Sequence, residues 1–322
     1  MGCLRAVLLL GPGQVTVAEV KPPEVPKGWA LVRSKLVGIC GTDKAFYKGT
    51  YKMFKVPLIP GHEVFGVVEE GPEELLGKEV TSEINFPCWT CDYCRSGMYT
   101  HCPRRKTLGI DFDGGMAEYF AAPAEALHPF PGPPEKGIFV EPLAAVLRAL
   151  SLRPPRPTDD VAVIGTGNVA WLTVQALRAL YGVRADLIVR RGSSKAQAYR
   201  GLVKDVVPID EAPESHYDVV FEVSGDPNAL DLAIRLAKPM GTIHLKSTPG
   251  SPSSANMTVA VVKEVEVIGS RCGTFREFRK AIDLLLRGLV EPRLDSVFPL
   301  EDAREAFEES AKPGIFKVAV RI

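Results

Sequence analysis

Short apolar runs separated by Gly and Pro make up most of the first 140 residues. Runs such as Ala30–Val37 and Val64–Val68 end at turn-forming residues, which is typical of β-strands. The run Ala6–Leu10 predicts a first strand, because five apolar residues before Gly11 are too few for a signal-peptide core or a membrane span. No long helical pattern occurs in this part of the chain. The pattern therefore predicts a β-rich N-terminal domain.

The pattern changes after the Pro-rich segment Arg153–Pro157. Val161–Ile164 is a continuous apolar run, which predicts a buried parallel strand. From here strand-like and helix-like patterns alternate, and this alternation predicts a doubly wound parallel sheet. The expected strands are Asp186–Val189, Asp218–Val223, Gly241–Leu245 and Val265–Ile268, and the expected helices are Asn168–Tyr181, closed by Gly182, Asn228–Ala237, and Phe275–Leu286, capped by Gly288.

A glycine-rich turn, Gly165-Thr166-Gly167-Asn168-Val169-Ala170, lies between the strand Val161–Ile164 and the next helix. This is the context that a dinucleotide fingerprint requires. Gly165 allows a tight turn, Gly167 lets the backbone approach a pyrophosphate, and the helix N-terminus, with Asn168 and Val169, offers a positive dipole end. The alternative is a structural strand-to-helix turn that binds nothing.

The end of the second strand predicts NADP rather than NAD. An NAD site usually has Asp or Glu there to accept the ribose hydroxyl, whereas this chain has Arg190 and Arg191. With the hydroxyls of Ser193 and Ser194, two guanidiniums suit a 2′-phosphate. The alternative is two solvated arginines on a surface loop.

Composition narrows the class of partner. The chain has 322 residues, enough for two domains, and its 39 Lys plus Arg balance 39 Asp plus Glu. No overall field therefore favours nucleic acid or an acidic membrane, and we expect a small-molecule partner. Only three Gln and four Asn accompany 27 Pro, a usage that suggests a thermophilic source.

Four cysteines lie close together in the segment 85–105, here called the cysteine lobe. Two, two and seven residues separate them, and the four are Cys88, Cys91, Cys94 and Cys102. Four thiolates at such spacing predict a tetrahedral structural zinc site. A ferredoxin-type cluster is one alternative, although its last gap is three residues long. Disulfides are the other, and they are unusual in a reducing cytosol outside hyperthermophiles.

Cys40 and His62 stand in the glycine-flanked segments GICGTD and GHE, and each alone is more often a structural residue than a metal ligand. The order of five motifs is more specific: GICGTD, GHE, the cysteine lobe, VEPLA at 140–144, and GTGNVA. This order resembles the zinc-dependent medium-chain alcohol dehydrogenase superfamily over nearly the whole chain. The resemblance implies an α/β protein with a GroES-like β-rich catalytic domain at 1–145, a Rossmann cofactor domain at 146–270, and a return to the catalytic domain at 271–322.

The same resemblance implies a catalytic zinc held by Cys40 and His62, with Glu141 as the third protein ligand. Glu141 is alternatively the N-cap of a helix that runs to Leu150. Glu63 is a competing carboxylate, either beside the metal or exchanging with water as a ligand. Asp43 matches the residue that orients the zinc-binding histidine.

The resemblance also implies that Thr42 touches the substrate oxygen and passes its proton onward while hydride moves between the substrate carbon and the nicotinamide. The pattern departs from the family at Ala45, where several relatives carry a polar group. An inactive relative that binds NADP without catalysis is therefore a further alternative. Asn85 replaces a histidine that threonine dehydrogenases tend to have, which lowers threonine as a substrate.

Four later residues resemble family positions near the cofactor, although for Arg271 a plain surface role is equally expected; they are Ser224, Lys246, Ser247 and Arg271. We expect a cytoplasmic oxidoreductase that interconverts an alcohol or polyol with its carbonyl compound using NADP(H), and by analogy a homodimer or homotetramer. An aldose is the alternative substrate. The basic residues of the lobe suggest a rival class, a nucleic-acid-binding zinc protein; they are Arg95, Arg104, Arg105 and Lys106.

Overall fold

The computed structural model describes residues 2–322, which form two compact units. The first unit contains the chain up to Ala144, Cys272–Leu286 and Leu294–Ile322, and the second contains Ala145–Arg271 and Arg287–Arg293. The sequence suggested one continuous return over 271–322. Instead, Arg287–Arg293 belongs to the second unit. Within it, the Glu291 carbonyl accepts a hydrogen bond from the Trp171 side chain at 2.9 Å, and the Glu291 amide donates to Gln175 at 2.8 Å.

A seven-stranded sheet organises the first unit around its longest strand, β3 (Trp29–Gly38). Its order is β16 (Ser296–Pro299), β17 (Val318–Arg321), β3, β4 (Glu63–Glu70), β5 (Glu79–Ser82) and β9 (Leu127–Pro129), and β8 (Tyr119–Pro123) also pairs with β3. β16 and β17 are parallel, and the other pairs are antiparallel. The last strand of the chain is therefore an interior strand of this sheet.

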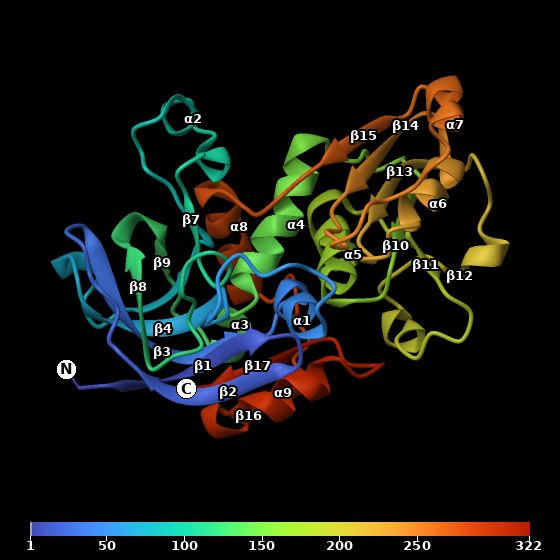
Figure 1. Cartoon of the computed structure of the whole chain (residues 1–322). Coiled ribbons are helices and arrows are strands. Elements are labelled where there is room, and N and C mark those ends of the chain that lie inside the picture. Colours follow the sequence, from blue (N-terminus) through green and yellow to red (C-terminus); the bar gives the residue numbers. More distant parts are fainter. Residues whose placement is uncertain (1) are drawn as a thin grey trace. The chain divides into compact units, whose positions relative to one another are not determined.

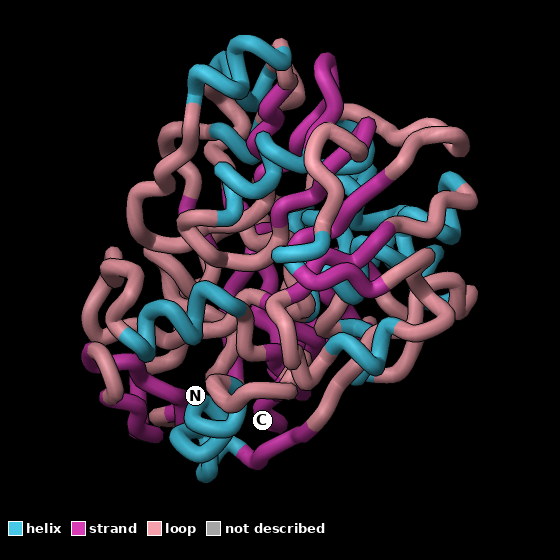
Figure 2. The backbone as a smooth tube through the Cα atoms, turned by 90° about the vertical axis from the view of Figure 1, so that its right-hand side faces the viewer, coloured by secondary structure: helices cyan, strands magenta, loops and turns pink. Residues whose placement is uncertain are grey.

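Loops and turns connect the helices and strands over much of the backbone (Figure 2). The expected first strand lies within β1, and the other expected strands lie within β3 and β4. The remaining strands are β1 (Leu4–Gly11), β2 (Gln14–Val20), β6 (Asn85–Phe86) and β7 (Lys106–Thr107), and the helices are α1 (Gly41–Lys48), α2 (Asp92–Arg95), α3 (Pro134–Gly137), α8 (Phe275–Leu286) and α9 (Ala303–Ser310).

Six parallel strands form the sheet of the second unit, which confirms the predicted doubly wound fold (Figure 1). Its order is β12 (Val206–Pro208), β11 (Asp186–Val189), β10 (Val161–Ile164), β13 (Tyr217–Glu222), β14 (Ala237–Leu245) and β15 (Glu266–Gly269). β10 is buried along its whole length, as its apolar run predicts. The chain proceeds from β10 to one side and then crosses back to β13, so the strand order reverses between β10 and β13.

The helices of the second unit are α4 (Val140–Leu152), which begins before the unit's first residue, α5 (Asn168–Tyr181), α6 (Ala229–Leu236) and α7 (Met257–Lys263). α5 has the predicted bounds, and α6 lies within the predicted range Asn228–Ala237. α5 ends at Gly182 in the left-handed conformation, as expected. β14 starts earlier than the predicted Gly241, because Ala237 already pairs with Tyr217 ahead of a register shift.

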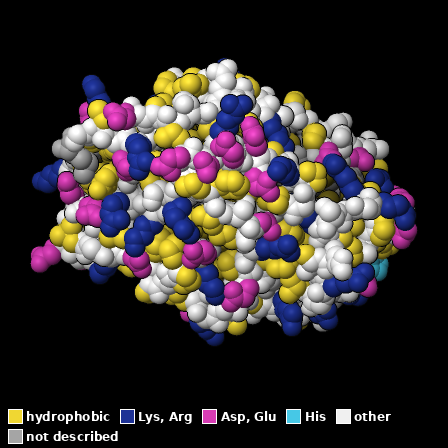
Figure 3. Space-filling view, turned by 90° about the horizontal axis from the view of Figure 1, so that it is seen from below, with side chains coloured by type: hydrophobic (Ala, Val, Ile, Leu, Met, Phe, Trp, Pro, Cys, Tyr) yellow, Lys and Arg dark blue, Asp and Glu magenta, His cyan; other side chains and the backbone are white. Residues whose placement is uncertain are grey.

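Residues 2–322 contain no helix that combines the length and hydropathy needed to cross a membrane. Basic and acidic side chains are interspersed over the face shown in Figure 3, in keeping with the balanced composition. On that face there is no broad field of one sign to attract a polyanion.

A buried polar network anchors the cysteine lobe to the rest of the first unit. Glu83 accepts a hydrogen bond from the Tyr99 hydroxyl at 2.7 Å and lies 2.9 Å from Nε2 of His128. The His128 ring stacks on Phe278 of α8, and the amide of Phe275 at the start of α8 donates to the Tyr99 oxygen. Burial raises the pKa of Tyr99, and Glu83 raises it further, so this hydroxyl keeps its proton. Three separate segments thus meet at one hydroxyl.

Replacing Tyr99 with Phe should lower the free energy of unfolding by about 1–3 kcal/mol, because it leaves a buried carboxylate oxygen of Glu83 without its donor and the Phe275 amide without its acceptor. Urea unfolding of the two proteins measures the difference. Tyr93→Phe is the matched control, since Tyr93 lies in the same lobe and is half exposed. An equal effect of both substitutions would contradict an anchoring role for the network.

His244 is a buried histidine in the second unit that should make stability depend on pH. It lies in β14, stacks on Phe221 at 4.5 Å, and hydrogen bonds to the Arg153 carbonyl at 2.9 Å. Burial lowers the pKa of His244 below its usual 6.5, so the unfolded chain binds the proton more readily than the folded chain. The contribution of neutral His244 to the stability of the folded state is therefore complete above pH 6.5 and is lost as the pH falls below that value.

We expect the stability of the wild-type protein to decrease more steeply below pH 6.5 than that of His244→Phe, which has no group to titrate. Urea unfolding at a series of pH values gives the two slopes. Phe221→Leu is the control, because it disturbs the same ring stack but leaves His244 in place, so the steeper slope should remain. Identical slopes for wild type and His244→Phe would disprove the assignment.

Candidate metal and cofactor sites

The pairing of β3 with β4 brings Cys40 and His62 to one end of the first unit's sheet. Gly38, the last residue of β3, lies opposite Glu63, the first residue of β4. Cys40 follows Gly38 by two residues and caps the N-terminus of α1, and His62 immediately precedes β4. The register of β3 against β4 therefore places Cys40 and His62 at the same end of the sheet.

His62 has the surroundings of a metal ligand. It is 3% exposed, and its Nδ1 has no hydrogen-bond partner among the described residues. Burial lowers the pKa of His62, but Cys40, which is within hydrogen-bonding reach, and the carboxylates of Asp43 and Glu141 raise it, and the net shift is strongly upward. A buried imidazole nitrogen that lacks a partner, beside a thiol and a carboxylate, fits the three-ligand set of an open zinc site.

The structure brings Cys40, His62 and Glu141 into one region without closing them as tightly as the lobe cysteines. Among residues 2–322, only the lobe has three or more such donors with all ligand atoms within 4.8 Å of one another. Glu141 is buried, and α4 begins at Val140, so Glu141 lies inside the first turn. The alternative that made Glu141 the N-cap is therefore wrong, because the helix starts one residue earlier.

Asp43, in the first turn of α1, interacts with both Cys40 and His62. It is fully buried, and its Oδ2 accepts the backbone N–H of Cys40 at 2.9 Å. Burial raises the pKa of Asp43 and the nearby His62 lowers it, with a net upward shift. Its Oδ1 has no hydrogen-bond partner among the described residues. This arrangement suits a carboxylate that fixes the Cys40 backbone and faces the His62 ring. Thr42 is half-buried one residue earlier in α1.

Lys317 is a residue of this region that the sequence reasoning missed. It precedes β17, and its ammonium group contacts Glu63 and also donates to the Ile39 carbonyl at 3.2 Å. The two charged side chains are 4% and 1% exposed. Glu63 is thus a buried carboxylate with a dedicated counter-charge. The sequence offers one signal for this pair. Glu63 begins the apolar strand EVFGVV, and a carboxylate buried in such a strand requires a positively charged partner.

The cysteine lobe has the geometry of a closed tetrahedral site. The sulfurs of Cys91 and Cys94 are 3.4 Å apart, those of Cys91 and Cys102 are 3.8 Å apart, and those of Cys102 and Cys88 are 3.5 Å apart. A zinc ion with four Zn–S bonds separates its sulfurs by about 3.8 Å. None of these separations approaches the roughly 2 Å of a disulfide bond. The residues therefore fit a structural zinc.

Side chains around the lobe affect its thiols in opposite directions. Hydrogen bonds from Thr90 and then from Arg104, whose guanidinium lies 3.2 Å from the sulfur, lower the pKa of Cys88 to about 5. Burial, followed by contacts with Cys91 and Cys102, raises the pKa of Cys94 to about 12. Metal binding requires thiolates, so the Arg104 side of the lobe favours the bound form before the ion arrives.

The glycine-rich turn of the second unit lies between the ends of β11 and β13. Gly165 has φ +120°, its amide donates to the Ile188 carbonyl at 3.2 Å, and a side chain there would meet the Ser224 backbone at 2.9 Å. At Gly167, by contrast, an added Cβ would meet no protein atom within 4 Å, which suits a place reserved for a ligand. Asn168, which starts α5, has a buried Oδ1 without a partner among the described residues.

The two arginines after β11 are exposed, and each is paired with carboxylates. Arg190 contacts Asp226 at 2.6 Å, and Arg191 contacts both Asp210 and Glu211 at 2.6 Å. The sequence reasoning missed these acids because they follow other strands, at positions 19 to 36 residues away. Both arginines are exposed, and both form ion pairs with these carboxylates.

The other predicted cofactor residues lie at the carboxyl ends of the sheet. The Ser193 amide closes a turn onto the Arg190 carbonyl at 3.1 Å, and the Ser224 hydroxyl donates to Glu222 at 2.6 Å. After β14, Ser247 accepts the amide of Gly225 at 2.8 Å, and Lys246 donates to the Ser270 carbonyl at 3.3 Å. Arg271 and Val169 are in the same unit.

Two family descriptions match the chain. The alcohol dehydrogenase GroES-like domain matches residues 26–132, and the zinc-binding dehydrogenase domain matches residues 199–287. An alcohol dehydrogenase of Geobacillus stearothermophilus is 30% identical over 92% of each chain, and a sorbitol dehydrogenase of Halalkalibacterium halodurans is 30% identical over 85% of each. A zinc-binding dehydrogenase structure from Sinorhizobium meliloti 1021, bound to NADP, is 28% identical with a TM-score of 0.90 and covers both chains fully.

Lys317→Met should destabilise the first unit by about 3–5 kcal/mol, because it leaves the buried Glu63 carboxylate without its counter-charge. Chemical denaturation measures the loss. The double variant Lys317→Met with Glu63→Gln removes both charges and should recover part of it. Lys312→Met is the control, since that lysine forms an exposed pair with Glu309. A loss no larger than that of the control would contradict the buried pair.

Proposed function

The chain belongs to the zinc-dependent medium-chain dehydrogenase family, and we propose that it transfers hydride between NADP(H) and an alcohol or polyol and its carbonyl counterpart. The observation that carries the proposal is the buried His62 nitrogen without a protein partner, beside Cys40 and Glu141. Relatives that are named alcohol and sorbitol dehydrogenases support this substrate class. An aldose is the alternative substrate.

In the proposed catalytic site, Cys40, His62 and Glu141 hold zinc, and a bound zinc supplies Lewis-acid polarisation of the substrate oxygen. Asp43 keeps the Cys40 backbone in place through its hydrogen bond. Thr42, in the first turn of α1, takes the proton of the substrate hydroxyl. Position 45, about one helical turn beyond Thr42, is Ala and has no polar group to receive this proton. The proton therefore leaves through water or the ribose hydroxyls of the cofactor.

Lys317 gives Glu63 a fixed place in this scheme. Since the Glu63 carboxylate is held by the ammonium group, we assign it to the surroundings of the metal rather than to the ligand set. The open position then stays available to the substrate oxygen, as a catalytic zinc site requires.

In the proposed cofactor site, the turn from Gly165 to Val169 and the N-terminus of α5 receive the pyrophosphate. Arg190 and Arg191 contact the 2′-phosphate, which makes NADP the preferred cofactor over NAD. The S. meliloti structure, which holds NADP, supports an NADP(H)-binding site in this fold. Ser224, Ser247 and the residues after β14 line the nicotinamide side.

Metal content and turnover of cysteine variants test the proposal. Wild-type protein should contain about two zinc ions per chain, one in the lobe and one at the catalytic site. Cys40→Ser should lose one zinc and all turnover while its affinity for NADPH remains. Cys3→Ser is the matched control, because Cys3 is exposed and belongs to neither group. Activity in zinc-free protein, or full turnover in Cys40→Ser, would refute the mechanism.

A further inference from the structure

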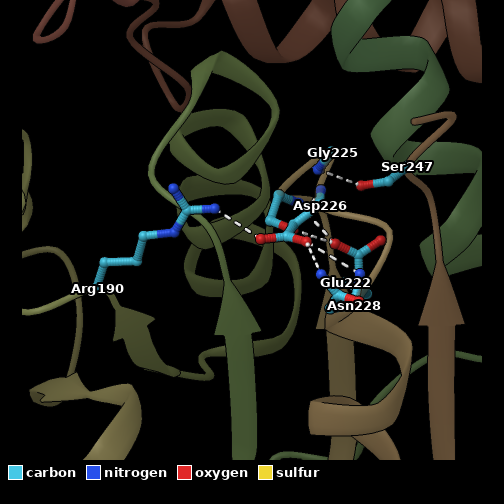
Figure 4. Close-up of polar contacts among 7 residues, drawn as sticks. Arg190, Glu222, Gly225, Asp226, Asn228 and Ser247 are labelled. Carbon is cyan, nitrogen blue, oxygen red and sulfur yellow. Dashed lines mark hydrogen bonds and ion pairs between the residues drawn. The ribbon is translucent and has the colours of Figure 1, made fainter. Parts of the chain in front are cut away.

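The ion pair between Arg190 and Asp226 spans the place where the strand order of the second unit reverses. Arg190 follows β11, Asp226 follows β13, and β10 lies between these strands. The turn after β10 passes through the same gap, since Gly165 contacts both the end of β11 and the backbone of Ser224. Ligands of doubly wound sheets bind in the crevice at this reversal. The Arg190 guanidinium reaches Asp226 (Figure 4), so the pair joins the carboxyl ends of β11 and β13 at the place proposed for the cofactor.

Asp226 is the fixed partner of this pair. Its Oδ1 accepts the backbone amide of Asn228 at 2.9 Å, and its own amide donates to the Ser224 hydroxyl at 3.0 Å. Ser224 is held in turn by Glu222, which is 1% exposed. The Asp226 side chain is 29% exposed, whereas that of Arg190 is 77% exposed. When a competing anion arrives, the guanidinium moves and the carboxylate stays.

The neighbouring arginine is held differently. Arg191 is bound by two carboxylates, Asp210 and Glu211, which lie on the segment after β12. Arg190 has one acidic partner in an exposed pair, and exposed pairs contribute little to stability. A phosphate forms charge-assisted contacts of the same kind with a guanidinium, so it can compete with this single carboxylate. Arg190 is therefore the arginine that a 2′-phosphate displaces from its acid most easily.

We propose that Asp226 competes with the 2′-phosphate of the cofactor for Arg190 and thereby narrows the preference of this chain for NADP over NAD. The inference rests on the proposed function. Binding of NADP must break the pair and bring its phosphate towards a fixed carboxylate, whereas NAD leaves the pair intact. Three carboxylates surround the two arginines. The preference for NADP over NAD is therefore weaker than it would be if both guanidiniums were unpaired.

Asp226→Asn tests the inference by direct binding. Asn keeps the oxygen that accepts the Asn228 amide, so the turn is preserved while the charge is removed. Titration calorimetry with NADPH and NADH gives both dissociation constants without need of turnover. We expect Asp226→Asn to bind NADPH with a dissociation constant about tenfold lower than that of wild type. The dissociation constant for NADH should change by less than about twofold. A tenfold change is the size expected from one charged contact of modest strength.

Two further variants separate this inference from other effects. Glu309→Gln is the matched control, because Glu309 forms a 2.6 Å pair with Lys312 in the first unit and is 26% exposed; it should change neither constant. In an Arg190→Ala background the gain from Asp226→Asn should be clearly smaller, because only the repulsion between phosphate and carboxylate remains to be relieved. An unchanged ratio of the two constants in Asp226→Asn, or an equal gain without Arg190, would overturn the inference. A wild-type protein that binds neither cofactor would instead contradict the proposed function itself.

Discussion

The register of β3 against its two neighbours is the constraint on which the candidate metal site depends. Gly38 lies opposite Glu63 on one side and Ala319 on the other. The residues just beyond these three positions therefore converge at one end of the sheet, among them Cys40 and His62. A slip of one residue in either ladder would turn the neighbouring side chains to the opposite face. Local sequence supplies the ligands, but strand pairing across the whole chain gives them a common site.

The two candidate zinc sites differ in the way their donors are assembled. The lobe takes all four thiols from one segment of fifteen residues, and their sulfur atoms already form a closed group. The proposed catalytic site takes Cys40, His62 and Glu141 from three separate elements, and their ligand atoms are less tightly grouped. A structural site gains from a complete shell, whereas a catalytic site needs a free position. The difference in assembly therefore agrees with the difference in proposed role.

The sequence predicted what local rules determine and missed what distant segments supply. Helix bounds such as Asn168–Tyr181 follow from periodicity and a terminal glycine, and the strand Val161–Ile164 follows from its continuous apolar run. Lys317 and Asp226 could not be found in this way. Each acts through a partner at least 36 residues away, and nothing in its own neighbourhood marks it. Pairing of charges across a fold depends on register and on crossover connections, which spacing in the sequence does not encode.

Burial decides which of these charge pairs the structure needs and which a ligand can alter. Lys317 and Glu63 are almost completely shielded from water, so separating them leaves a charge that the interior cannot solvate, which lowers the stability of the unit. Arg190 and Asp226 are open to solvent, and water compensates for most of what is lost when they separate. The first pair can therefore hold a carboxylate in place beside a metal. The second can be exchanged for a phosphate, and that makes it suitable for discriminating between two cofactors.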